Sequence, residues 1–97
     1  MPIKIDALGN KSWLNENGKK HRLNGPAVEL VDGGKFWYEN GKRHKLDGPA
    51  VEYHDGSKFW YLNGELHRIG GPAVEKNDGS RAWWVRGKKT SLDKFRR

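Results

Sequence analysis

The sequence predicts an all-β protein, an antiparallel β-meander of about four stacked hairpin units of 23 residues each. Three observations lead to this fold. Short motifs recur with a fixed shift of 23 residues along the 97-residue chain. Pairs of turn-forming residues separate short runs of β-forming residues. No stretch combines the helical spacing of apolar residues with a cap and sufficient length.

The recurring motifs define the units. GPAVE begins at Gly25, Gly48 and Gly71, and an Asp-Gly pair and a Trp follow it each time. An Asn-Gly pair and a His come next in the first two of these units, whereas the third has Arg86-Gly87 and Thr90 there. The units 25–47 and 48–70 share 14 of their 23 positions. We therefore interpret residues 1–97 as a single repeat array that also has a degenerate N-terminal unit at 2–24, a degenerate C-terminal unit at 71–93 and a basic tail at 94–97.

The fixed shift places the first unit in line with the others without any insertion or deletion. Ile5 then stands where Val28 stands, and Leu14 stands where Trp37 stands. Degenerate end units are expected of a stacked array, because its ends face water rather than a neighbouring unit.

The elements of one unit follow from its residues in order. Residues 49–54 are rich in β-formers and begin with Pro, so they predict a first strand. Asp55-Gly56 predicts a turn, and residues 58–62 predict an aromatic second strand. Asn63-Gly64 predicts a two-residue hairpin turn, and a third turn follows at 70–72. We expect Gly48 and Gly64 to need positive φ.

Alternation along each aromatic strand distributes its side chains over two faces. Phe36 and Tyr38 point one way, and Trp37 points the other way with Lys35 and Glu39. Stacked units should align these residues in aromatic rows. We expect one row to form a thin core and the other to be partly exposed for binding.

The composition is rich in aromatic residues and poor in aliphatic ones. Apolar residues make up 34% of the chain and the mean hydropathy is −1.00, yet five Trp, three Tyr and three Phe are present. Cysteine is absent, so neither disulfides nor thiolate metal sites are expected. The first ten residues lack the apolar run of a signal peptide, which predicts a cytoplasmic protein.

The segment NGKRH from Asn40 to His44, with an Asp-Gly pair elsewhere in each unit, resembles the MORN repeat (membrane occupation and recognition nexus). Asn17 to His21 is similar. The resemblance implies an elongated twisted sheet used as a binding surface for proteins and sometimes for phospholipids. GPAVE makes the units more similar to the "NG-x-x-HR-x-x-GPA" type of phage and bacterial proteins. That variant implies an accessory protein or inhibitor that acts on a host or defence protein, in the host cytoplasm.

Repetition argues against an enzyme. A catalytic group is needed once, whereas His and Asp-Gly recur in unit after unit. One His per unit is too widely spaced for a shared metal site, and we expect each His to stabilise a turn. We therefore predict no catalytic residue, no metal site and no cofactor.

The formal charge of +7 favours an acidic partner. Residues 17–24, 40–47 and 86–97 carry net charges of +3, +2 and +5, whereas the net charge of residues 63–70 is zero. We predict a protein-binding module, with nucleic-acid binding through a basic edge as the first alternative and anionic-membrane association as the second. Open edge strands also allow a homodimer. The predicted protein contacts are Trp37, Tyr38, Lys42, Arg43, Trp60, Tyr61, Trp83 and Trp84. The predicted basic edge comprises Lys19, Lys20, Arg22, Lys88, Lys89, Arg96 and Arg97.

Overall fold

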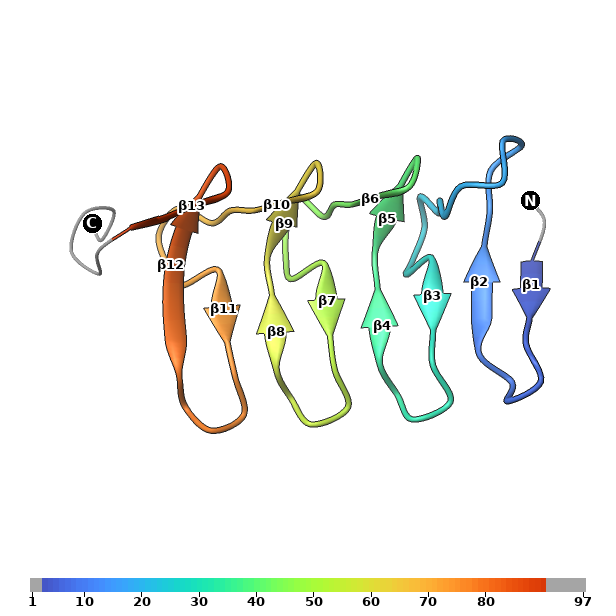
Figure 1. Cartoon of the computed structure of the whole chain (residues 1–97), viewed down its shortest axis with the longest axis horizontal. Helices are drawn as coiled ribbons and strands as arrows, with labels where there is room; N and C mark the ends of the chain where they lie inside the picture. The colour runs from blue at the N-terminus through green and yellow to red at the C-terminus, as the bar shows by residue number, and fades with distance from the viewer. Residues whose placement is uncertain (1–2, 91–97) are drawn as a thin grey trace.

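The computed structural model describes residues 3–90, and no helix occurs among them. Nine strands form one antiparallel sheet in the order β1-β2-β3-β4-β7-β8-β11-β12-β13 (Figure 1). Their bounds are β1 (Ile3–Ile5), β2 (Lys11–Trp13), β3 (Val28–Glu29), β4 (Lys35–Phe36), β7 (Val51–Glu52), β8 (Lys58–Phe59), β11 (Val74–Glu75), β12 (Arg81–Val85) and β13 (Lys88–Thr90). This arrangement confirms the predicted all-β meander.

Two smaller hairpins lie above the main sheet in the view of Figure 1. One pairs β5 (Tyr38–Glu39) with β6 (Lys42–Arg43), and the other pairs β9 (Tyr61–Leu62) with β10 (Glu65–Leu66). Asn40 and Gly41 close the first hairpin with φ of 50° and 85°. Two positive φ values define a type I′ turn, which confirms the turn predicted from Asn-Gly.

The opposite turns of the sheet depend on Asp-Gly. Gly56 has a φ of 93°, and the Asp55 carboxylate accepts a hydrogen bond from the Ser57 N–H at 2.8 Å. That hydrogen bond, with a further one from the Ser57 side chain, lowers the pKa of Asp55. Gly64 has the expected positive φ, at 86°, but Gly48 does not adopt one, so the expectation for Gly48 was wrong.

Backbone hydrogen bonds at the tryptophan position repeat from unit to unit. The Trp37 N–H donates to the Ala50 carbonyl at 2.7 Å, and the Trp37 carbonyl accepts from the His44 N–H at 3.1 Å. Trp60 makes the same two bonds, to Ala73 and from His67, 23 residues further along.

In the first unit, the residue with this bonding pattern is Trp13 rather than Leu14. Its N–H donates to Ala27 at 2.7 Å, and its carbonyl accepts from His21 at 2.8 Å. The prediction that no insertion is needed was therefore wrong, because one extra residue lies in the turn at 15–19, between the paired residues Leu14 and Lys20. The same shift places Ile5 opposite Lys11, as Glu29 is opposite Lys35, so Ile5 does not take the place of Val28.

The buried apolar side chains are small, which differs from the expected aromatic core. Ala50 is fully buried and Val51 is 1% exposed. The equivalent residues of the neighbouring units are buried as well: Ala27, Val28, Ala73 and Val74. The described aromatic residues are half-buried, except Tyr53, which is exposed. Each of these alanines accepts the backbone hydrogen bond of a tryptophan, as Ala50 does from Trp37, and its small side chain leaves room for the indole beside it.

The sheet is a single layer with extents of 43 × 27 × 18 Å, and the units follow one another along the longest axis (Figure 1). Within residues 3–90 there is no helix long and apolar enough to cross a membrane.

Candidate interaction surfaces

The sheet has two faces of different chemistry. Cross-strand pairs place Phe36, Val51 and Phe59 on one face, which also carries Tyr38 and Tyr61 and is called here the tyrosine face. The opposite face carries Trp13, Trp37, Trp60 and Trp83 and is called the tryptophan face. Alternation along β12 separates Trp83 from Trp84 in the same way. The predicted protein contacts are therefore divided between two faces and do not form one surface.

On the tryptophan face, Arg68 connects the tryptophan strand of its own unit with the start of the next unit. Its guanidinium lies 3.9 Å from the centre of the Trp60 ring and donates to the Pro72 carbonyl at 3.0 Å and to the Glu75 carboxylate at 3.3 Å. We call this arrangement the arginine clasp. It gives the motif HR-x-x-GPAVE a physical meaning, because the Arg, the Pro and the Glu of the motif all meet there.

Arg22 makes the same clasp in the first unit. It lies 3.9 Å from the Trp13 ring centre and bonds to the Pro26 carbonyl and the Glu29 carboxylate. Lys45 lies 3.9 Å from the Trp37 ring centre in the second unit. Arg22 was predicted to belong to the basic edge, but its charge is neutralised on the tryptophan face by Glu29.

Each recurring histidine joins one unit to the next. Nδ1 of His44 accepts a hydrogen bond from the Asn63 N–H at 3.0 Å. His21 and His67 accept in the same way from Asn40 and Arg86, at 2.9 and 3.0 Å. The expectation that these histidines stabilise turns is confirmed, and the bond always reaches the hairpin turn of the following unit.

Exposed aliphatic residues follow the clasp position in each unit. Leu23, Leu46 and Ile69 are 71%, 82% and 60% exposed, and we call them the aliphatic ridge. They border two equivalent grooves of about 510 and 420 Å³, which include Trp37 and Trp60 respectively in their walls. None of these three residues was predicted from the sequence to contact a partner. The available signal was an aliphatic residue at one position of every unit, in a chain that is poor in aliphatic residues.

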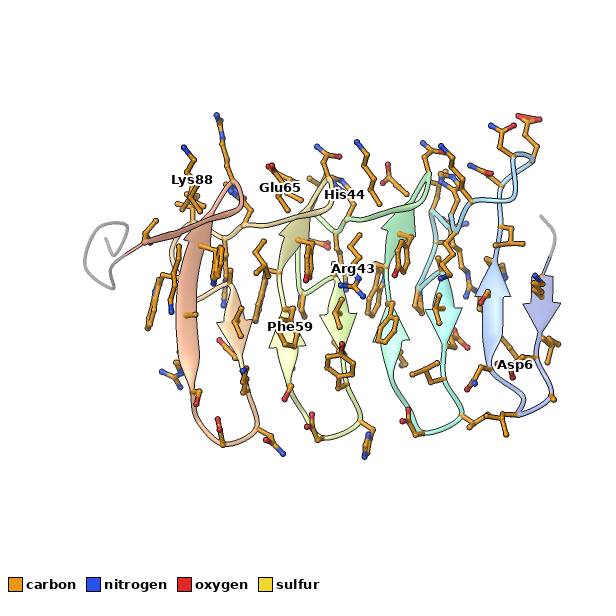
Figure 2. All side chains as sticks on the ribbon, viewed as in Figure 1. Asp6, Arg43, His44, Phe59, Glu65 and Lys88 are labelled. Carbon is orange, nitrogen blue, oxygen red and sulfur yellow. The ribbon has the colours of Figure 1, made fainter. Side chains whose placement is uncertain are left out.

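On the tyrosine face, Arg43 lies between two units. Its guanidinium hydrogen-bonds the hydroxyls of Tyr38 and Tyr61, both at 3.3 Å (Arg43 is labelled in Figure 2). Desolvation alone would lower the pKa of Arg43, but the hydrogen bonds and charge interactions with the two tyrosines raise it overall. Nearby, Tyr53 makes edge-on ring contacts with both Phe36 and Phe59.

At the N-terminal end of the tyrosine face lies an open groove of about 800 Å³, which we call the lysine groove. Its described lining residues contain no Asp or Glu. They are Lys4, Ser12, Leu14, Gly18, Lys19, Lys20, Tyr38, Asn40, Gly41 and Lys42.

The lysine groove divides the predicted basic edge. It contains Lys19 and Lys20, and it also brings in Lys42, a predicted protein contact. Lys88 and Lys89 lie on β13 at the opposite end of the sheet (Lys88 is labelled in Figure 2). Arg96 and Arg97 lie outside the described residues.

The lower half of the tryptophan face carries charges that alternate in sign from strand to strand. Lys35 faces Glu29 on one side and Glu52 on the other, and Glu52 also faces Lys58. Lys11 and Arg81 continue the alternation at the two ends. Opposite charges in register stabilise neighbouring strands.

Among residues 3–90, no three His, Asp or Glu side chains come together in an arrangement that could hold a metal ion. Comparisons of the chain with protein-family models, with curated proteins and with solved structures found no match. The resemblance to MORN repeats therefore remains a prediction.

Proposed function

We propose that the chain is a non-catalytic protein-binding module whose contact surface is the aliphatic ridge. One observation carries this proposal: Leu23, Leu46 and Ile69 occupy the same position in three units, and each is at least 60% exposed. A single exposed aliphatic residue is ordinary, but a row of them needs a partner to remove it from water. The resemblance to units of phage and bacterial proteins supports a host or defence protein as the class of partner.

The absence of catalysis is supported by how the polar residues are used. His21, His44 and His67 each offer Nδ1 to a backbone N–H of the next unit. Asp55 and Asp78 accept hydrogen bonds from their own turns. These groups hold turns in place, and a structural role of this kind explains why they recur in successive units.

The spacing of the ridge supports an amphipathic helix as the binding element of the partner. Each central unit adds two strands to the main sheet, and strands lie about 4.8 Å apart, so successive ridge residues lie about 10 Å apart. Seven residues of an α-helix rise about 10.5 Å. A helix with one apolar position per heptad therefore matches the ridge, one heptad to each unit.

Charge supports an acidic flank on that helix. Arg22, Lys45 and Arg68 directly precede the three ridge residues. Glu29 and Glu75 pair with Arg22 and Arg68, so the attraction comes from Lys45 and from the formal charge of +7 of the whole chain. Acidic residues beside the apolar stripe would be drawn to this surface and would orient the helix along the ridge.

The test combines capture with hydrogen exchange. The wild-type chain, Leu46→Ser and Val31→Ser are used to capture partners from lysate, and the captured partner is then added back to the purified chain. Val31 is a matched control, because it is 66% exposed but lies at a turn away from the ridge. We expect Leu46→Ser alone to lose the partner, and the bound chain to be protected at 22–25, 45–48 and 67–69. Equal retention by both variants, or protection on the tyrosine face instead, would refute the assignment.

A further inference from the structure

The divergence of the first unit has a specific result on the tyrosine face. Along the central strands this face carries Val and Phe, as in the pairs Val28–Phe36 and Val51–Phe59. In the first unit, the corresponding pair is Lys4–Ser12. A serine in place of a phenylalanine leaves space beside Tyr38, and a lysine in place of a valine brings a charge to that space.

A second replacement adds to the first. Leu14 is paired with Lys20, as Tyr38 is paired with Arg43 in the next unit. The Lys20 ammonium lies 5.4 Å from the centre of the Tyr38 ring, much as the Arg43 guanidinium lies 5.3 Å from that of Tyr61. However, Arg43 is held by two tyrosine hydroxyls, whereas Lys20 is an exposed side chain bordering the lysine groove.

The remaining cations come from the hairpin turns. The Lys19 side chain runs along the next unit, where a Cβ added to Gly41 would lie 3.4 Å from it. Lys42 follows that same Gly41, so the second turn contributes its own ammonium group. Lys4, Lys19, Lys20 and Lys42 are all exposed, and they surround the groove from the edge strand and from two successive turns.

We infer that the lysine groove binds the phosphate backbone of a single-stranded nucleic acid. Four ammonium groups without a described carboxylate among the lining residues form a site for several phosphates rather than one. The groove opens onto a face with aromatic side chains, Tyr38 in the groove and Phe36 and Tyr53 beyond it, against which unpaired bases can stack. This site is separate from the aliphatic ridge, which lies on the opposite face.

Fluorescence anisotropy with a labelled oligodeoxythymidine of about twelve nucleotides tests this inference. The variant Lys20→Gln/Lys42→Gln is compared with Lys35→Gln/Lys58→Gln. Both remove two positive charges, but Lys35 and Lys58 lie on the tryptophan face, outside the groove. Thermal melting of each variant checks that the fold is kept.

We expect the groove variant to bind about tenfold more weakly at low salt and the control to bind within about twofold of the wild type. The dependence of log K on log salt should also become shallower by about 1.4, because each lost phosphate contact removes about 0.7. Equal weakening by the two variants would show attraction by net charge alone and would overturn the inference. So would the absence of binding by the wild type, equal binding of a duplex of the same length, or full displacement of the probe by equimolar pyrophosphate.

Discussion

At the scale of single residues, the hairpin turns show how much one backbone angle matters. Asn40 and Asn63 take φ values near 50°, which asparagine tolerates, but in the third hairpin Arg86 is held at the same angle. A side chain with a long stem adopts this conformation at a cost of about 1 kcal/mol. The C-terminal unit therefore contains a strained turn that the central units avoid.

Replacing that arginine should stabilise the protein. We expect Arg86→Asn to raise the free energy of unfolding by about 0.5 to 1 kcal/mol, which corresponds to a few degrees in Tm. Thermal melting followed by circular dichroism measures the change. The reverse substitution in the second hairpin, Asn63→Arg, should lower Tm by a similar amount, and a Tm unaffected by both would contradict the strain.

The Asn-Gly and Asp-Gly turns of the central units were predictable from the residues, whereas the backbone angle of Gly48 and the register of the first unit were not. Asn-Gly and Asp-Gly specify backbone angles locally, so their positions follow from the sequence. Leu14 was mistaken for the equivalent of Trp37, because the first turn contains two asparagines, Asn15 and Asn17, and a fixed shift aligns only the second. The hydrogen bonds of Trp13 and the pairing of Ile5 with Lys11 reveal the extra residue.

At the scale of the element, the arginine clasp unites a tryptophan strand with the GPAVE strand that follows it in the chain. Arg22 and Arg68 each make two hydrogen bonds besides the ring contact. At the equivalent position, Lys45 makes the ring contact with Trp37, and no hydrogen bond joins it to a described residue through its side chain. A planar guanidinium can stack and donate at once, whereas a single ammonium cannot do both as well.

This difference predicts opposite effects for two substitutions that keep the charge. Lys45→Arg should gain the hydrogen bonds to the Pro49 carbonyl and to Glu52, and so stabilise the protein by about 0.5 to 1 kcal/mol. Arg68→Lys should destabilise it by a similar amount. Urea unfolding gives both values, and effects of the same sign would contradict the clasp.

The clasp could not be predicted from the sequence, although its residues recur at fixed positions when the units are aligned. Spacing showed that Arg, Pro and Glu recur together, but periodicity does not say which side chains meet in space. The predicted alternation of Phe36 and Trp37 was right, yet the buried side chains are Ala50 and Val51. Hydrophobicity alone would favour the larger side chains as the core. Small side chains are buried instead, because they leave room for the neighbouring indole.

At the scale of the whole molecule, the protein is a row of units in which each contacts its neighbours only. Stability in such an array is a sum of unit and interface terms, so opening is easiest at the ends. In the described part of the chain, one end is β1, an edge strand whose residues are all exposed, while β4, β7 and β8 lie in the middle of the sheet.

Native-state hydrogen exchange should follow this order. The N–H groups of Trp37 and Trp60, which donate to Ala50 and Ala73, should exchange at least about tenfold more slowly than that of Asp6, which donates to Asn10. Uniform protection along the chain, measured by NMR, would instead indicate that all units open together.

Each recurring histidine accepts a hydrogen bond from a residue later in the chain, which bears on the order in which the units fold during synthesis. His44 provides the acceptor and leaves the ribosome before Asn63, which provides the donor. The same order holds for His21 and His67 and their donors. Because synthesis proceeds from the amino end, the hairpin turns at Asn40, Asn63 and Arg86 each emerge after the histidine to which they donate. Assembly can thus keep step with translation, with each finished portion acting as the template on which the next one closes.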